Sequence, residues 1–204
     1  MFCLSQRRAQ RTLALEVVLA FSLLFAHQEL LAAPSDAKES PSPCKLESLP
    51  EDIRGTLTRR FGEWKVQEPA DLSASARDKW AADSASSCPG IAIGRFQNDK
   101  DTAYALLLIP LDRSDPECAL IIFTQQAGGR GIYGYKLVER AETGGIDTFV
   151  LSTTTSKYLQ GDSIWKSRSR PRDSVLVVNA GAKGPEAYVY YWTNDTYLRQ
   201  QVSY

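Results

Sequence analysis

The sequence predicts an α+β fold in which N-terminal helices pack on a mainly antiparallel β-meander sheet. Two observations lead to this prediction. Apolar residues recur at helical spacing only near the start of the presumed domain, and after Pro89 they follow the shorter period of strands. The connections between the strand-like runs are mostly too short for crossover helices, so neighbouring strands are expected to run antiparallel. We therefore expect one sheet of roughly seven or eight strands.

Residues 1–32 are typical of a secretory signal peptide. Arginines precede an apolar run from Val17 to Ala26, and the small residues Ala32 and Ala33 follow it. The run is well short of the ~20 residues that cross a bilayer, so no transmembrane segment is expected. Cleavage is expected after Ala32, with a second candidate site after Ala26. The mature protein is then predicted to be periplasmic or extracellular.

The rest of the chain divides into a leader and one domain. Residues 33–43 are rich in Pro, Ser, Ala, Asp and Lys and are too poor in apolar side chains to pack. They predict a flexible leader. Residues 44–204 are then expected to form a single α+β globular domain, which is long enough to bury one substantial core.

Two helices are predicted at the start of this domain. Ser48 is expected to cap the first helix, with Pro50 at its first position, Glu51 closing a capping box and Gly62 at its end. A second, weaker helix is predicted from about Ser73 to Asp83. The apolar stripes are Leu49, Ile53, Leu57 and Phe61 in the first helix and Leu72, Ala76 and Trp80 in the second.

After Pro89, apolar runs separated by turn-forming residues predict strands. The runs are Ile91 to Phe96, Ala103 to Ile109, Ala119 to Thr124, Ile132 to Val138, Thr148 to Ser152, Ser174 to Asn179, Ala187 to Trp192 and Thr196 to Val202. Asn194 and Asp195 occupy the last turn, and Gly181 and Gly184 occupy the turn before it. The strand-rich region therefore fills most of the predicted domain.

One hairpin resembles a known family. Gly94-Arg95-Phe96 follows Cys88-Pro89-Gly90 and precedes an apolar strand from Tyr104, which is similar to the core of FG-GAP or VCBS-like blades. The resemblance implies a bend at Gly94 and an inward Phe96. It does not imply the calcium site of that family, because Arg95 stands where the cation needs an oxygen ligand. The chain is also similar to small secreted bacterial proteins of undefined function that end in an aromatic hairpin.

Three cysteines, Cys44, Cys88 and Cys118, remain after the predicted export into a compartment where thiols oxidise. One disulfide and one unpaired cysteine are expected. In an up-down-up meander Cys88 and Cys118 lie at the same end of the sheet, so this pair is preferred. The pair Cys44 with Cys88 is the next alternative, and three unpaired thiols are the third.

The sequence excludes the common catalytic arrangements. The only histidine, His27, leaves with the signal peptide, so neither a Ser-His-Asp nor a Cys-His site can form. We predict no catalytic residue, no cofactor and no metal site, and the net charge of zero gives no indication of a nucleic-acid partner. The remaining route to hydrolysis is a pair of carboxylates. The candidates are Asp99, Asp101, Asp112, Asp115, Glu117 and Asp147.

Two side-chain patterns are candidates for binding a partner. Aromatic residues that share one strand face either pack in the core or contact a sugar ring or a protein; they are Tyr188, Tyr190 and Trp192. Alternating basic residues either form a solvated loop or bind an anion; they are Lys166, Arg168, Arg170 and Arg172. We expect a non-catalytic binding module for an unidentified protein or polysaccharide. A hydrolase that uses only carboxylates is the alternative.

Overall fold

The computed structural model describes residues 44–83, 88–112, 117–126, 129, 131–142, 144–158, 171–181 and 184–204. These residues belong to the unit Pro41–Tyr204. The predicted signal peptide, residues 1–32, and the predicted leader, residues 33–43, lie outside the described residues.

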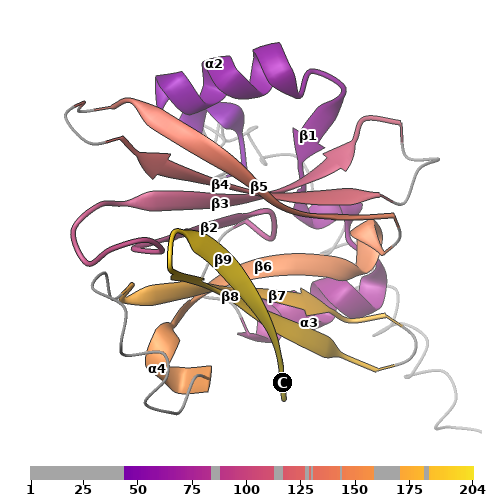
Figure 1. The fold of residues 1–204 in the computed structure, drawn as a ribbon. Helices are drawn as coiled ribbons and strands as arrows, with labels where there is room; N and C mark the ends of the chain where they lie inside the picture. The colour runs from indigo at the N-terminus through magenta and orange to yellow at the C-terminus, as the bar shows by residue number, and fades with distance from the viewer. Residues whose placement is uncertain are drawn as a thin grey trace, which may run out of the picture. The chain divides into compact units, whose positions relative to one another are not determined.

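Antiparallel strands are the main regular structure of the described chain (Figure 1), which confirms the predicted, mainly antiparallel β structure. The strands are β1 Trp64–Val66, β2 Ile91–Gly94, β3 Ala103–Pro110, β4 Cys118–Gln125, β5 Tyr133–Ala141, β6 Thr148–Thr154, β7 Asp173–Asn179, β8 Glu186–Thr193 and β9 Thr196–Val202. All of these except β1 fall on the apolar runs identified in the sequence. β1 is too short to show a period.

The strands form two sheets, and the expectation of a single sheet is therefore wrong. Sheet A has the order β1-β3-β4-β5, with β2 also paired to β3, and sheet B has the order β6-β7-β8-β9. The division falls between β5 and β6, where Gly144 adopts a φ of 90° before the 3-10 turn η3, Gly145–Asp147. The physical reason lies in β3 and β4. Both strands are apolar on both faces, so a cover on one face alone would leave the other face in water.

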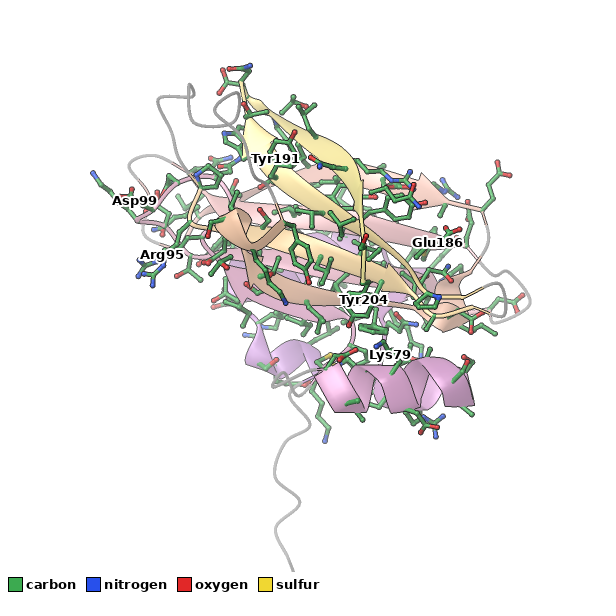
Figure 2. The ribbon with its side chains drawn as sticks, turned by 90° about the horizontal axis from the view of Figure 1, so that it is seen from below. Lys79, Arg95, Asp99, Glu186, Tyr191 and Tyr204 are labelled. Atoms are coloured by element: carbon green, nitrogen blue, oxygen red, sulfur yellow. A yellow bond between two sulfur atoms is a disulfide. The ribbon has the colours of Figure 1, made fainter. Side chains whose placement is uncertain are left out.

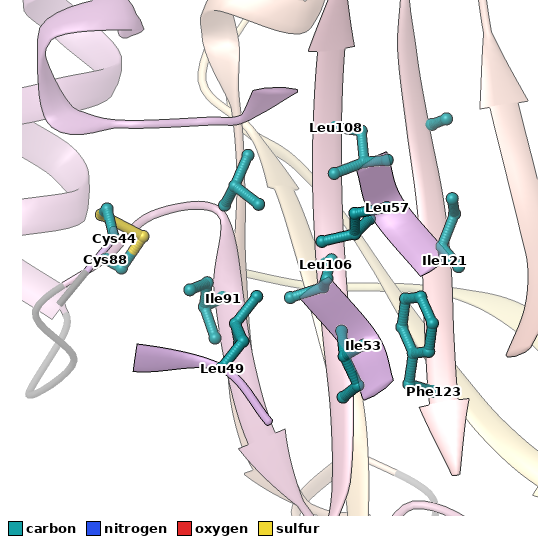
Figure 3. Packing of buried hydrophobic residues seen from close by; sticks show 12 residues of the cluster. Cys44, Leu49, Ile53, Leu57, Cys88, Ile91, Leu106, Leu108, Ile121 and Phe123 are labelled. Carbon is teal, nitrogen blue, oxygen red and sulfur yellow. A yellow bond between two sulfur atoms is a disulfide. The ribbon is translucent and has the colours of Figure 1, made fainter. Parts of the chain in front are cut away.

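Three clusters of buried side chains define the layers. On one face of sheet A, residues of α2, Glu51–Arg60, pack against the central strands (Figure 3). The opposite face of sheet A packs against the inner face of sheet B. The outer face of sheet B contacts α3, Ala74–Asp83. The order of layers is therefore α2, sheet A, sheet B and α3 (Figure 1).

The helices begin differently from each other. The predicted capping box at Ser48 is wrong, because Ser48 ends the 3-10 turn η1, Leu46–Ser48, and its Oγ donates to the carbonyl of Lys45 at 2.8 Å. Helix α2 has Pro50 as its N-cap and no side-chain cap. In contrast, Ser73 accepts a hydrogen bond on Oγ from the N–H of Ala76 at 3.3 Å, at the start of α3. Helix α4, Thr155–Tyr158, is a single turn. None of the helices in the described ranges is long and apolar enough to cross a membrane.

Cys44 and Cys88 form a disulfide, with their Cα atoms 5.2 Å apart (Figure 3). The preferred pairing of Cys88 with Cys118 is therefore wrong, and the second alternative is correct. Cys44 and Cys88 lie in the cluster on the α2 side of sheet A, whereas Cys118 lies in the cluster between the sheets. The same end of a sheet is not enough for a disulfide, because side chains alternate between its faces. Cys118 is free and buried.

Candidate functional site

The three aromatic residues predicted to share a face of β8 point into the space between the sheets. Tyr190 is 4% exposed and Trp192 is 7% exposed, so both are core residues, which is one of the two alternatives that the sequence left open. The Trp192 ring contacts Tyr197, with their centroids 4.8 Å apart. Tyr188 is half-buried and lines a pocket. The three residues therefore do not form an exposed aromatic surface.

The predicted basic strip falls largely outside the described residues, because Lys166, Arg168 and Arg170 belong to the range 159–170. Arg172 is described and exposed. Its carbonyl accepts a hydrogen bond from the N–H of Thr155 at 3.1 Å, which places Arg172 beside α4.

The β2–β3 connection contains the Gly94-Arg95-Phe96 turn. Phe96 is fully buried, and a Cβ atom at Gly94 would lie 2.6 Å from its ring, so glycine allows the ring to fold back against the strand. Asn98 then accepts two hydrogen bonds on Oδ1 from the N–H groups of Lys100 and Asp101, each at 2.8 Å. Within the described residues, no group of three or more His, Cys, Asp or Glu side chains could hold a metal ion.

A pocket of about 260 Å³ lies between the two sheets, and we call it the end pocket. Its lining comes from β3, β4 and β5 of sheet A and from β6 to β9 of sheet B. The apolar part of the lining includes Leu107, Leu120 and Val177. None of the described acids named from the sequence lines this pocket. The carboxylates that do line it are Glu139 and Glu186.

Charged side chains connect the two sheets at the end pocket. Arg199 on β9 donates from Nη1 to Glu139 Oε1 on β5 at 3.0 Å. The guanidinium carbon of Arg199 also lies 3.7 Å from the centroid of the Tyr188 ring. The Tyr188 hydroxyl donates to Glu186 Oε2 at 3.2 Å. The pocket therefore combines an apolar lining with carboxylates, a phenol and a guanidinium.

Cys118 also lines the end pocket and is 6% exposed. Burial, with smaller contributions from Glu139 and Glu117, raises the pKa of the Cys118 thiol to about 11. The thiolate is the nucleophilic form of cysteine, so a thiol with this pKa is a poor nucleophile near neutral pH. Cys118 is therefore a wall of the pocket rather than a candidate nucleophile.

A second candidate site lies on the outer face of sheet B, around the C-terminal end of α3. Tyr204 donates from its hydroxyl to Asp83 Oδ2 at 2.7 Å, and Lys79 Nζ lies 3.1 Å from the same oxygen. Lys79 Nζ is also 4.7 Å from the centroid of the Tyr204 ring (Figure 2). On α4, Lys157 Nζ lies 4.9 Å from the centroid of the Tyr158 ring. We call these five residues the tyrosine–lysine cluster.

The pKa shifts of Tyr204 and Asp83 have causes in both parts of the cluster, the α3 residues and the α4 residues. Burial, the hydrogen bond to Asp83, the charge of Asp83 and Tyr158 raise the pKa of Tyr204. The hydrogen bond from Tyr204 lowers the pKa of Asp83, Lys79 and Lys157 lower it further, and burial opposes them. Lys157 and Tyr158 of α4 therefore lie within electrostatic range of the α3 residues.

The outer face of sheet B continues from the cluster toward the β8–β9 hairpin. Tyr191 is half-buried against the outer cluster, and its register partner Leu198 is 43% exposed. Figure 2 shows Tyr191 and Tyr204 from this side of the molecule. Helix α3 thus covers only part of the face, and half-exposed tyrosines occupy the remainder.

A second hollow, of about 580 Å³, lies beside the disulfide between η1, the end of α2 and β1. Phe61 and Trp64 line it, and its rim includes Leu46 and Leu111, both of which are exposed. Besides these apolar residues, its lining includes two lysines and two glutamates, which are Lys45, Glu47, Lys65 and Glu68.

Sequence reasoning did not identify Glu139, Glu186 or Arg199. Arg199 had one usable signal, because it is a charged residue between Tyr197 and Gln201 on the strand face that points between the sheets. That signal depends on knowing which face is inside, which requires the second sheet. No protein-family model, curated protein or solved structure matches this chain.

Proposed function

We propose that the protein is an exported, non-catalytic binding module that contacts an acidic polysaccharide of the cell envelope through the outer face of sheet B. The tyrosine–lysine cluster is the observation on which this proposal rests. It places two lysine–tyrosine pairs, from α3 with the C-terminus and from α4, on one partly exposed sheet face.

The chemistry of the cluster suits acidic sugar rings. Tyrosine rings offer apolar faces for stacking, and the adjacent ammonium groups offer donors to carboxylates or sulfates. Lys79 and Lys157 together carry more positive charge than Asp83 neutralises, and the exposed Arg172 lies beside α4. A repeating acidic polymer could engage both lysine–tyrosine pairs at once, whereas a neutral glycan would use only the rings.

Export is supported by the signal-peptide pattern of residues 1–32 and by the buried Cys44–Cys88 disulfide. Structural disulfides form and persist in oxidising compartments. Intact-mass analysis of the protein recovered from its native cells should give a chain that begins at Ala33 or His27. A soluble cytoplasmic form that still carries Met1 would contradict export.

The binding proposal can be tested with polygalacturonate as the acidic probe and dextran as the neutral one. We expect titration calorimetry at low salt to detect binding to polygalacturonate only, and added salt to weaken it because exposed charges are screened. Lys79→Gln combined with Lys157→Gln should abolish the binding. Lys100→Gln, an exposed lysine in the β2–β3 connection, is the matched control and should leave it unchanged. Equal binding of both polymers, or of neither, would exclude the proposal.

The alternative, a hydrolase that works with carboxylates alone, is favoured by one observation, which is that Glu139 and Glu186 line the same pocket. A panel of glycans and peptides tests it by turnover. Activity that either Glu139→Gln or Glu186→Gln removes, with unchanged thermal stability, would establish the hydrolase in place of the binding module.

A further inference from the structure

The end pocket is distinct from the tyrosine–lysine cluster, because it opens between the two sheets rather than on the outer face of sheet B. The two carboxylates that line the end pocket each use only one oxygen in a hydrogen bond within the described residues. Glu139 uses Oε1 for Arg199, and Glu186 uses Oε2 for the Tyr188 hydroxyl. The second oxygen of each carboxylate makes no hydrogen bond to the described residues. The pocket thus offers strong acceptors to a ligand.

The charged donor in the lining is the Arg199 guanidinium, which already pairs with Glu139. Thr148 donates its hydroxyl to the carbonyl of Gly144 at 2.7 Å, and Asn179 donates from Nδ2 to Thr148 Oγ1 at 3.3 Å. Both side chains are therefore already engaged. The lining sets the two carboxylates of Glu139 and Glu186 against the single guanidinium of Arg199, and this excess of negative charge favours a cation over a carboxylate or a phosphate.

Arg199 shows that the rim already accommodates a cation. Its guanidinium lies against the face of Tyr188 and pairs with Glu139, whose side chain is only 28% exposed. An inward charge on an edge strand also discourages association with other sheets. Discouraging association with other sheets would not require a cavity. Here, however, the Arg199–Glu139 ion pair borders a pocket that the Cys118 thiol also lines. This thiol is more than nine-tenths buried and has no partner in the described part of the chain.

The size of the pocket restricts the ligand further. At about 260 Å³ it is smaller than the ~300–1,000 Å³ typical of sites for drug-sized molecules. Leu107, Leu120 and Val177 give it an apolar wall suited to methylene groups. The pocket therefore suits one short alkyl chain with a charged end, rather than a sugar or a ring system.

We propose that the end pocket binds a primary alkylammonium group, with the ammonium between Glu139 and Glu186 and the alkyl chain against Leu107, Leu120 and Cys118. The group can come from a free alkylamine or from a lysine side chain of a partner protein. Both sources have the same chemistry, and two arms of the test separate them.

Cys118 provides a direct reporter of occupancy, because it lines the pocket. The rate at which methyl methanethiosulfonate modifies the Cys118 peptide is measured by mass spectrometry at about pH 9, where the amine is still mostly protonated. We expect millimolar n-butylamine to slow this modification by a factor of about five or more, and n-butanol at the same concentration to have no effect. Equal protection by n-butanol would overturn the proposal, since it would show an apolar cavity without cation selectivity.

Variants at the rim sharpen the test. Glu186→Gln should weaken protection by n-butylamine about tenfold. Arg199→Gln should strengthen it, because the change removes a competing cation and leaves both Glu139 oxygens available. Glu51→Gln on α2, far from the pocket, is the control and should match the unmodified protein. Thermal unfolding confirms that each variant is folded. Protection that Glu186→Gln leaves unchanged would overturn the proposal.

The second arm replaces n-butylamine with the peptide acetyl-Gly-Lys-Gly-amide and its Gln-containing counterpart. Protection by the lysine peptide alone assigns the pocket to a partner's side chain. Protection by n-butylamine but not by the peptide assigns it to a free amine. Protection by neither compound excludes the alkylammonium site, and it leaves the polysaccharide proposal intact because that proposal concerns another face.

Discussion

Sheets A and B have similar strand numbers but very different coverage. In sheet A, β3 and β4 are buried at most positions, with α2 on one side and sheet B on the other. In sheet B, β9 is exposed at most positions and α3 covers only part of the outer face. The difference indicates a division of roles. The central strands of sheet A are expected to contribute more to stability than the edge strand β9 of sheet B, whose side chains are more accessible.

The largest expected effect concerns the disulfide that fastens the start of the domain to sheet A. Replacing both Cys44 and Cys88 by alanine should lower the free energy of unfolding by about 4 kcal/mol, on a chain-entropy estimate for a separation of 44 residues. Urea unfolding of the double variant measures this. A loss below about 1 kcal/mol would mean that the packing of α2 alone holds the segment.

A matched pair of leucines tests the comparison of the sheets directly. Leu106→Ala in β3 should cost about 3 kcal/mol, because it removes a fully buried side chain from the α2 side of sheet A. Leu198→Ala in β9 should change stability by less than about 0.5 kcal/mol, because that side chain is 43% exposed. Similar losses in the two variants would refute the proposed division of roles.

The Cys118 thiol predicts a loss of stability in alkaline solution. Its pKa rises from 9.0 to about 11 on folding, so the folded state favours the protonated thiol. The associated stability is fully present below pH 9.0 and disappears as the pH rises through about 11, a loss of about 3 kcal/mol. Unfolding of the wild-type protein and of Cys118→Ala is compared across this range. Parallel pH profiles would contradict the prediction.

The smallest expected effect is at the β8–β9 turn of sheet B. Asn194 and Asp195 have φ values of 46° and 64°, which is the left-handed conformation of both central residues in a type I′ turn. Because glycine adopts this conformation without strain, Asp195→Gly should raise stability by about 0.5 kcal/mol. Thermal unfolding detects the change. If Asp195→Gly instead lowers the stability, the Asp195 side chain stabilises the folded state by more than its left-handed backbone conformation destabilises it.

The strands could be predicted from the sequence because their signal is local. Alternating or continuous apolar residues between turn formers located eight of the nine described strands, and α3 begins one residue after the predicted Ser73. The start of α2, in contrast, was predicted wrongly, because Ser48 does not form the expected capping box. The competing hydrogen bond to Lys45 depends on a 3-10 turn, which the sequence pattern does not reveal.

The candidate sites were harder to predict than the strands. Tyr204 and Lys79 are more than 100 positions apart in the sequence, and only the packing of α3 on sheet B brings them together. In the same way, the pairing of Arg199 with Glu139 requires two edge strands from different sheets. Neither arrangement leaves a spacing in the sequence that could be recognised.

The sequence by itself determined the strand positions, the first helix and the presence of one disulfide with one free cysteine, since these follow from local periodicity and from composition. The tertiary structure decided that the strands divide into two sheets, that Cys44 rather than Cys118 pairs with Cys88, and that Tyr190 is buried while Tyr204 lies at the surface. The physical reason is the same in each case. A residue's periodicity fixes which neighbours share its face, but only the packing of sheet on sheet decides whether that face meets water, another strand or a ligand.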